Sequence, residues 1–280
     1  MTTMSFTRGG MPFSVQICAD SVSKNGSRIT TFALTYPRFI HAQMMTHRML
    51  SRNAQSSRAM PVSKMLDETP VIPTNLRYNQ KGMQPAESLS LADQEKAFAL
   101  LVKLHEQTMK TVKALDKLGV HKQWANRYLE PFRTITAIYT ATAQAWAAFF
   151  DLRAHPDAQE EICWLAEEMK KLYVSNYQNV AHTEIHLPFV REDEQELPLL
   201  DKFKLSSARC ARVSYLTFEG KRDLEKDFEL HDRLAKASPP HLSPLEHCAI
   251  ADAGFAMNAN FRGWKSYRFL MEEEYLTLES

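Results

Sequence analysis

The stretch ITTFALTYPRFIHAQMMTHRMLSRNAQSSR, residues 29–58, joins a β-type segment to a cluster of arginines and serines. Residues 29–36 are rich in β-branched and aromatic side chains and end at Pro37, which predicts a strand. The apolar spacing in residues 38–50 is closer to helical, so we expect a helix to follow. Guanidinium groups match phosphate and carboxylate oxygens. Residues 46–58 are therefore either an anion-binding segment or a polar surface.

Composition is typical of a globular protein. The chain has 280 residues, of which 44% are hydrophobic and 24% charged, and its formal net charge is +1. A charge this small creates no global attraction to nucleic acid or a membrane, so any anion site is local. No run of 18 apolar residues occurs, and the polar N-terminus does not resemble a signal peptide. We therefore expect a cytoplasmic protein that binds neither membrane nor nucleic acid.

Cysteine and glycine usage narrows the kinds of site. Cys18, Cys163, Cys210 and Cys248 form no C-x-x-C pair, which favours free thiols in a reducing cytoplasm over disulfides or zinc. The eight glycines form neither G-x-G-x-x-G nor G-x-x-x-x-G-K. A bound nucleotide would therefore be held by arginines, helix N-termini and serine hydroxyls.

The rest of the chain has mainly helical patterns. Residues 61–89 hold four prolines and predict a long loop. Ser90–Asp93 resembles a capping box, and the apolar stripe behind it ends at Gly119. The uncharged stretch within residues 133–152 predicts a buried helix. Further expected elements are a helix over about 160–177, an acidic, proline-containing connector over 183–204, and a last helix over about 222–236.

Arginines also occur outside the opening segment. Arg153 lies between the predicted buried helix and the next helix start, where it could reach an anion at that N-terminus. The alternative is a salt bridge to Asp151 or Asp157. Residues 206–215, SSARCARVSY, are basic but lack a wider basic stripe with aromatics, so they do not predict nucleic-acid binding.

HLSPLEHC, residues 241–248, contains two histidines and a glutamate. The spacing differs from H-E-x-x-H, and the Ser-Pro pair indicates a turn. We expect no metal site here, but a turn whose serine and glutamate bond a ligand or cap a helix.

Together, these segments resemble the flavin-dependent thymidylate synthases. That family has a signature R-H-R-x-x-S-x-N-x-x-S-x-R, which is matched here by Thr46-His47-Arg48, Ser51, Asn53, Ser56 and Arg58. The strand, proline and glutamine before the signature are matched by Phe32, Pro37, Phe39 and Gln43. The family's A-R-x-x-L-P and L-R-A-x-x-x-A-Q-x-E-I blocks resemble residues 126–131 and 152–162. The resemblance covers about half of the chain.

The order of the blocks resembles a circular permutation of the family's domain. In the family, A-A-R-V-S and H-x-[ST]-P-[FL]-E-H precede the signature, whereas the similar residues 210–214 and 241–247 follow it here. The resemblance implies an α+β fold with a central antiparallel sheet packed by long helices. It implies a single domain over residues 1–280, with a signature and helical part at about 12–180, a connector at about 181–205 and a permuted block at about 206–280.

The resemblance also implies roles for residues, because the family's signature lies between flavin and a pyrimidine deoxynucleoside monophosphate. The implied substrate-binding residues are Gln43, Ser56, Ser57, Arg58, Arg127 and Arg153, the last two from a neighbouring subunit. The residues implied to face FAD are His47, Arg48, Asn53, His241, Ser243 and Glu246. Arg153, Ser56 and Arg58 are the implied catalytic residues, and no metal is implied.

Several positions depart from the family pattern. They are Thr46 for the first signature arginine, Ala54 for a glutamate, Thr142 and Gln144 for an asparagine–arginine pair, and Asp157 for a histidine. Most of these changes remove polar contacts to FAD or the nucleotide, so the base or the product can differ from thymidylate. Trp264, by stacking, and Arg268 are candidate replacements.

The family's reaction takes its one-carbon unit from methylenetetrahydrofolate, its hydride from reduced FAD and its reducing equivalents from NADPH. No cysteine here has a setting that lowers its pKa, Cys210 between arginines being the nearest, which agrees with a mechanism lacking an enzyme nucleophile. The protein would orient the substrate and activate it electrostatically.

The simplest implied activity is methylation of dUMP to dTMP. The alternatives are a dCMP or dUMP hydroxymethylase or hydroxylase on the same scaffold, and a non-catalytic nucleotide-binding paralogue. We also expect a homo-oligomer, a tetramer, because the long apolar helix at 133–152 needs burial beyond one subunit.

Overall fold

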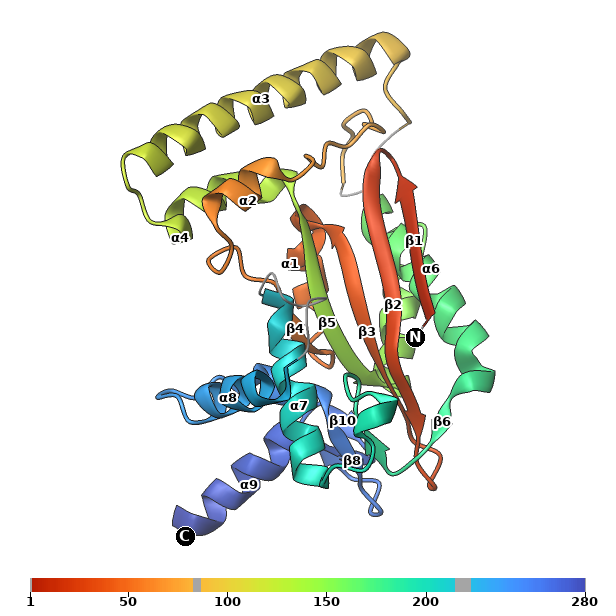
Figure 1. Cartoon of the computed structure of the whole chain (residues 1–280). Helices are drawn as coiled ribbons and strands as arrows, with labels where there is room; N and C mark the ends of the chain where they lie inside the picture. The colour runs from red at the N-terminus through yellow and green to blue at the C-terminus, as the bar shows by residue number, and fades with distance from the viewer. Residues whose placement is uncertain (1, 83–86, 215–222, 280) are drawn as a thin grey trace.

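The computed structural model describes residues 2–82, 87–214 and 223–279, and it has an α+β architecture around an antiparallel sheet (Figure 1). The strand order is β1-β2-β3-β5-β4, and β6 pairs with β2 in parallel. The bounds are β1 (Thr2–Arg8), β2 (Met11–Val22), β3 (Arg28–Pro37), β4 (Ser51–Ala54), β5 (Thr134–Thr142) and β6 (Ala181–His182). The expected fold class and the strand over residues 29–36 are thus confirmed.

A tight hairpin that the sequence analysis did not assign begins the sheet. Gly9 and Gly10 join β1 to β2 with φ values of 56° and 76°, the left-handed conformations that a two-residue hairpin turn requires. A Cβ on Gly9 would lie 2.9 Å from the Trp164 ring, so glycine also permits close packing there. Along β2, alternate side chains such as Phe13 and Val15 face the core.

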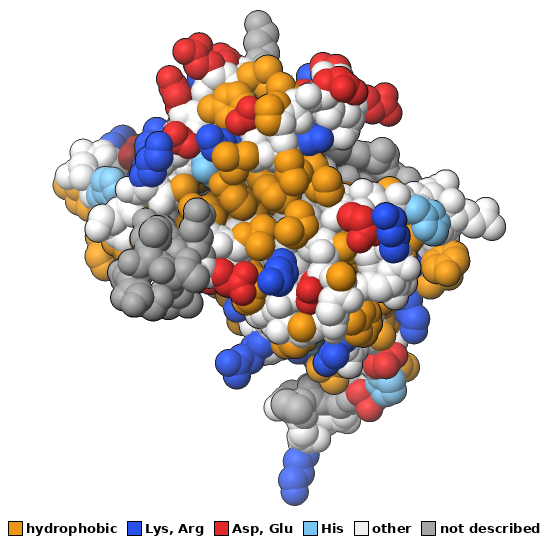
Figure 2. Space-filling view, turned by 90° about the horizontal axis from the view of Figure 1, so that it is seen from below, with side chains coloured by type: hydrophobic (Ala, Val, Ile, Leu, Met, Phe, Trp, Pro, Cys, Tyr) orange, Lys and Arg blue, Asp and Glu red, His pale blue; other side chains and the backbone are white. Residues whose placement is uncertain are grey.

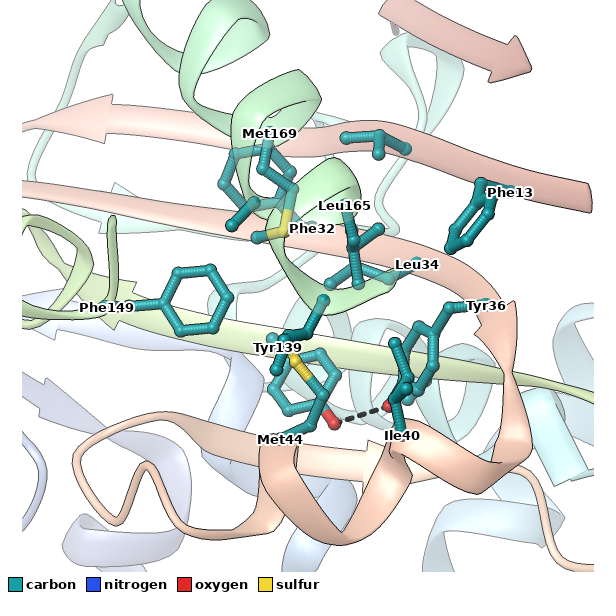
Figure 3. Close-up of a cluster of buried hydrophobic side chains, with 14 of the residues drawn as sticks. Phe13, Phe32, Leu34, Tyr36, Ile40, Met44, Tyr139, Phe149, Leu165 and Met169 are labelled. Atoms are coloured by element: carbon teal, nitrogen blue, oxygen red, sulfur yellow. Dashed lines mark hydrogen bonds between the residues drawn. The ribbon is translucent and has the colours of Figure 1, made fainter. Parts of the chain in front are cut away.

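The main core lies between this sheet and two helices, α5 (Ala143–Arg153) and α6 (Glu160–Ser175). Figure 3 shows side chains from both layers, including Phe32, Phe149 and Leu165, pointing toward one another. The hydroxyls of Tyr36 and Tyr139 share a 2.7 Å hydrogen bond inside this cluster (Figure 3). Burying each such large apolar side chain stabilises the fold by about 1.5–3 kcal/mol.

The prediction of one buried helix over residues 133–152 is wrong for its first half. Residues 134–142 form β5, which pairs along its length with β3 and also with β4, and only the second half is α5. The β-branched residues of β5, among them Ile135 and Ile138, favour the strand. Since the sheet and α5 bury residues 134–142 within one subunit, this half of the segment gives no reason for oligomerisation.

The segment around the signature is also more divided than expected. The helix predicted over residues 38–50 is limited to the 3-10 turn η1 (Arg38–Ile40) and the short α1 (His41–Met45), and β4 follows. The long loop at 61–89 contains one short helix, α2 (Val62–Asp67), and is otherwise irregular where described.

The helix predicted from the capping box is α3 (Leu91–Lys117), and the Ser90 hydroxyl caps it by accepting from the Asp93 N–H at 3.2 Å. Its C-terminal part packs on α4 (Lys122–Ala125) and η2 (Asn126–Phe132), but only Val112 of its apolar stripe is buried. Figure 1 shows α3 lying apart from the sheet.

The C-terminal part contains helices and a small second sheet. The connector predicted over residues 183–204 is partly wrong, because α7 already begins after Pro198. The helix predicted over about 222–236 is confirmed as α8, but it is not the last one, because α9 follows. Residue 222, at the predicted start of this helix, lies outside the described residues, as does Tyr215 at the end of the basic segment 206–215. The bounds are η3 (Asn176–Asn179), β7 (Ile185–His186), η4 (Glu192–Glu194), α7 (Leu199–Ala211), η5 (Arg212–Ser214), α8 (Leu224–Ala235), η6 (Ser243–His247), β8 (Ala249–Ala251), β9 (Met257–Asn258), β10 (Phe261–Arg262), β11 (Trp264–Ser266) and α9 (Tyr267–Glu279).

A buried chain of hydrogen bonds attaches this part to the central sheet. His186 bonds Ser21 (2.9 Å) and Thr31 (2.8 Å), Thr31 bonds Thr140 (2.6 Å), and Thr140 bonds His247 (2.8 Å). Burial lowers the pKa of His186 to about 4 and that of His247 to about 3, so both are neutral at pH 7.

The face seen from below carries a broad group of hydrophobic side chains (Figure 2). At this end of the molecule lie α7, β8 and α9 (Figure 1). Leu199 and Leu200 at the start of α7 are exposed, and Ile185, Ile250 and Met271 are only partly buried. None of the helices in the described ranges is long and apolar enough to cross a membrane.

Candidate anion-binding site

Arg153, the last residue of α5, points its guanidinium at the signature segment. Its Nε donates to Nε2 of His47 at 2.8 Å and its Nη2 to Oγ1 of Thr46 at 3.0 Å, and a longer contact of 3.4 Å reaches Oε1 of Gln43. The structure thus joins three residues implied by the resemblance, Arg153, His47 and Gln43, although they come from different segments. Thr46, at the position of the missing signature arginine, completes the group.

None of these partners neutralises the Arg153 charge. Burial, and then the Arg153 charge, lower the pKa of His47 to about 4, so His47 is neutral at pH 7 and accepts through Nε2. Arg153 forms no ion pair with any described residue, so the alternative salt bridge to Asp151 or Asp157 is absent. A partly buried guanidinium with only uncharged partners favours binding of an anion.

Local packing fixes this arrangement. The Thr46 hydroxyl donates to the Gln43 carbonyl oxygen at 2.7 Å and ends α1, and the His47 ring meets the Phe149 ring edge-on with 4.8 Å between centroids. Phe149 is fully buried on α5, one turn before Arg153. The core therefore sets the positions of both His47 and Arg153.

A cavity of about 980 Å³ lies beside Arg153 and Gln43. Its lining includes four acidic residues, Asp157, Glu160, Glu161 and Glu167, and two further arginines that no sequence motif marks, both of which are neutralised. Arg8 pairs with Glu167 at 3.3 Å and stacks 4.7 Å from the Trp164 ring centroid, and Arg77 pairs with Glu160. These residues belong to no signature, so only the fold could reveal them. A second cavity, of about 740 Å³ beside Cys18 and Asp20, is lined by none of the predicted site residues.

The predicted residues Ser56, Ser57 and Arg58 lie in a turn after β4, next to η2. Ser57 is buried and Arg58 is exposed, and Arg58 forms no ion pair with a described residue. Arg127 of η2 pairs with Glu130 at 2.9 Å and remains half-exposed. Across the described ranges, no hydrogen bond or ion pair connects this turn or Arg127 to Arg153.

A third group joins the signature to the C-terminal block. The Asn53 amide donates to the Cys210 carbonyl oxygen at 3.0 Å, and the Ser243 hydroxyl lies 3.5 Å from the Asn53 side-chain oxygen. Glu246 accepts from Arg268 at 2.6 Å. Asn53, Ser243 and Glu246, all implied to face FAD, therefore come from distant parts of the chain to one region.

The remaining predicted residues differ in accessibility. Arg48 and His241 are exposed, as are Gln144 and Asp157, whereas Thr142 is buried at the end of β5. The expectation that Trp264 stacks on a ligand is wrong. Its side chain is fully buried against Ile29 and Phe261, and its Nε1 donates to the Ser27 carbonyl oxygen at 3.2 Å.

The cysteines and metal-type residues give no further site. All four cysteines are free, and burial raises the pKa of Cys18 to about 12 and that of Cys210 well above its usual value. In the segments that the structure describes, no three histidines, cysteines or acidic residues are placed to share a metal ion. His247 of the HLSPLEHC segment instead lies in the core.

Comparison with known proteins agrees with the signature. A sequence profile of the family described as "Thymidylate synthase complementing protein" matches residues 28–176. This span is more than half of the chain and contains β3, the signature, Arg127 and Arg153. The chain therefore belongs to this family.

One curated relative is the flavin-dependent thymidylate synthase of Thermosipho melanesiensis (strain DSM 12029 / CIP 104789 / BI429), which is 31% identical over 151 residues, 52% of this chain. The chain covers 62% of that relative's length.

Solved structures of the UMP/dUMP methylase PolB from Streptomyces cacaoi are also similar. The structure bound with 5-Br UMP matches with a TM-score of 0.49 and 19% identity, covering 58% of this chain and 89% of that one. The structure bound with 5-Br dUMP matches with a TM-score of 0.43 and 22% identity, covering 53% and 66%.

Proposed function

We propose that this protein modifies C5 of a pyrimidine deoxynucleoside monophosphate in a flavin-dependent reaction, most simply methylation of dUMP to dTMP. One observation carries the proposal: the unneutralised guanidinium of Arg153 is held by signature residues beside a cavity of about 980 Å³. Family membership and the name of the Thermosipho relative support the reaction class.

The substrate's anionic groups need cationic partners, and three arginines are candidates. Arg153 is held by uncharged side chains, Arg58 has no ion pair with a described residue, and Arg127 has only a half-exposed one. Each charge-assisted hydrogen bond contributes about 1.5–3 kcal/mol. Since Arg58 and Arg127 do not contact Arg153 within one chain, we propose that neighbouring subunits complete the site.

FAD is the cofactor that the proposed reaction needs, and it would supply the hydride. Asn53, Ser243 and Glu246 offer an amide, a hydroxyl and a carboxylate in one region, a donor and acceptor set that suits the polar edges of a flavin nucleotide. In this proposal NADPH reduces the flavin and methylenetetrahydrofolate donates the carbon. The chain's own residues orient the pyrimidine and stabilise charge through their guanidinium groups.

We also propose the permuted block order. The family match ends at residue 176, and Asn53 of the signature contacts both Cys210 and Ser243 of the later block. Contacts of this kind are what a permuted domain needs, because a new connector leaves the packing of the blocks unchanged.

We infer that two copies associate through α3. Leu100 and Leu104 on this helix are 68% and 56% exposed. Acidic residues lie near the start of α3 and lysines near its end, among them Asp93, Lys110 and Lys113, so antiparallel packing of two copies pairs opposite charges.

Light scattering, which measures the molar mass in solution, tests the association through α3. Leu100→Glu with Leu104→Glu should give a monomer, and the control pair Leu199→Glu with Leu200→Glu on α7 should leave the oligomer intact. A wild-type monomer would contradict the inference.

A second candidate is a hydroxymethylase or hydroxylase acting on dCMP or dUMP. Thr46, which replaces the signature's first arginine and contacts Arg153, favours it because the altered contact lies within the site. Mass spectrometry distinguishes the two after incubation with dUMP or dCMP, methylenetetrahydrofolate, FAD and NADPH. We expect dTMP from dUMP. A hydroxylated or hydroxymethylated product would overturn methylation, and nucleotide binding without any product would favour a regulator.

A further inference from the structure

The turn that carries Ser56 and Arg58 is held from one side by Asn126. The Asn126 side chain is fully buried, and its Nδ2 donates to the carbonyl oxygens of Ser57 at 2.8 Å and Met60 at 2.9 Å. Asn126 stands where the family's A-R-x-x-L-P block, to which this segment bears a resemblance, has alanine.

A second side chain, on the neighbouring helix α4, contacts the same turn. Lys122, four residues before Asn126, donates through Nζ to the Ala59 carbonyl oxygen at 3.3 Å. The carbonyls of Ser57, Ala59 and Met60 are thus directed at α4 and η2. The Arg58 side chain is exposed, away from these contacts.

The position of Asn126 also links two parts of the proposed site. It directly precedes Arg127, so one residue fixes the turn with Ser56 and Arg58 next to the backbone that carries Arg127. Two polar atoms in this contact, Oδ1 of Asn126 and Oγ of Ser57, are buried and have no hydrogen-bond partner among the described residues. Because a buried polar atom without a partner lowers stability, the arrangement is not optimised for stability alone.

We propose that Asn126 is a positioning residue, which orients the Ser56–Met60 turn so that Arg58, together with Arg127, meets the phosphate of the pyrimidine nucleotide. The inference rests on the proposed function. It predicts that removing the amide donors weakens nucleotide binding through the misplacement of Arg58, although Asn126 itself does not touch the nucleotide.

Calorimetric titration of the FAD-loaded protein with dUMP tests the proposal. Asn126→Ala should raise the dissociation constant at least about tenfold, the effect of losing one charge-assisted contact. The control is Asn258→Ala, because Asn258 is also buried and donates to two backbone carbonyls, of Ala256 and Trp264, away from the turn; it donates to the Asp252 carboxylate as well, at 3.0 Å. Asn258→Ala should lower the midpoint of urea unfolding about as much as Asn126→Ala does, and it should leave the dUMP affinity unchanged.

A double-mutant cycle separates positioning from general destabilisation. In the Arg58→Ala background, Asn126→Ala should have little further effect on dUMP affinity, because it acts through Arg58. Full additivity of the two losses, or wild-type affinity in Asn126→Ala, would overturn the proposal.

If Asn126→Ala does not fold, Lys122→Met removes only the Ala59 contact and should weaken binding about threefold. Unchanged affinity in that variant would then overturn the proposal. Failure of the wild-type protein to bind dUMP would instead overturn the proposed function, and this inference with it.

Discussion

Arg153 and Arg209 both lie near the C-terminal ends of helices, but their surroundings are opposite. Arg209 of α7 is buried, pairs with Glu194 at 2.5 Å and Asp227 at 2.9 Å, and donates to the Phe189 carbonyl oxygen. Arg212 shares Asp227 at 2.6 Å, so two guanidinium groups face two carboxylates. Arg153 instead contacts only uncharged side chains and borders a cavity.

The charge of the partners therefore indicates what each arginine does. A guanidinium that is fully paired inside the protein contributes to folding, and removing it leaves buried carboxylates without a partner. A guanidinium without an anionic partner at a cavity can bind an external anion. Variants of the two arginines should accordingly affect stability and ligand binding in opposite proportions.

The largest effect on stability should come from Arg209→Met. It leaves Glu194 and Asp227 buried with too little positive charge, since hydrogen bonds from Arg209 hold the pKa of Glu194 below its usual value. Breaking a buried pair in this way costs about 3–5 kcal/mol of unfolding free energy. Urea unfolding monitored by circular dichroism measures the loss, and a loss below about 1 kcal/mol would show that the network is not structural.

Acid should produce an effect of comparable size, through the buried histidines. Since the folded protein lowers the pKa of His186 to about 4 and that of His247 to about 3, the unfolded chain binds protons first as pH falls below 6.5. The contribution of the two neutral histidines to the unfolding free energy is fully present above pH 6.5. It decreases as the pH falls toward 4 for His186 and toward 3 for His247, by up to about 1.4 kcal/mol per pH unit for each histidine.

Urea unfolding at pH 7, 6 and 5 measures this dependence. His247→Gln lowers stability at pH 7, but it should reduce the slope between pH 6 and pH 5 by about 1.4 kcal/mol per unit. An unchanged slope would mean that His247 is not held neutral in the folded protein.

The smallest effect on stability should come from Arg127→Ala. Its pair with Glu130 is half-exposed, and such surface pairs contribute about 0–1 kcal/mol. The variant should therefore unfold within about 0.5 kcal/mol of the wild-type protein, while dUMP affinity falls because a phosphate partner is lost. Normal dUMP affinity would show that Arg127 is not part of the proposed site. A large loss of stability would show that Arg127, like Arg209, has a structural role.

The sequence predicts best those elements whose periodicity has one interpretation. The stripe and Ser90 cap of α3 and the β-branched run of β3 identify both elements. Residues 134–142 do not, because an uncharged buried run suits a helix as well as a central strand, and only pairing with β3 decides. An aromatic residue such as Trp264 suits ligand stacking as well as core packing, and the sequence does not show that it packs on Ile29.

The site shows the same division. The signature predicts His47, the glutamine before it predicts Gln43, and the separate L-R-A block predicts Arg153, but only the fold shows that these side chains meet. Arg8 and Trp164 line the adjacent cavity from β1 and α6, and no motif marks them. Asn126, for which we propose a positioning role, belongs to no signature, and only the fold shows that its amide holds the turn beside Arg58.

Titration of Arg153→Met and of the wild-type protein with dUMP tests whether Arg153 binds the substrate's anionic groups, provided that the unfolding free energy of both proteins is also measured. We expect a dissociation constant raised at least about tenfold, with stability changed by less than about 1 kcal/mol. Arg153→Lys, which keeps the charge but not the planar fork, should give an intermediate affinity. Wild-type affinity in Arg153→Met would show that Arg153 does not bind the nucleotide, and a loss of stability as large as that of Arg209→Met would show that its role is structural.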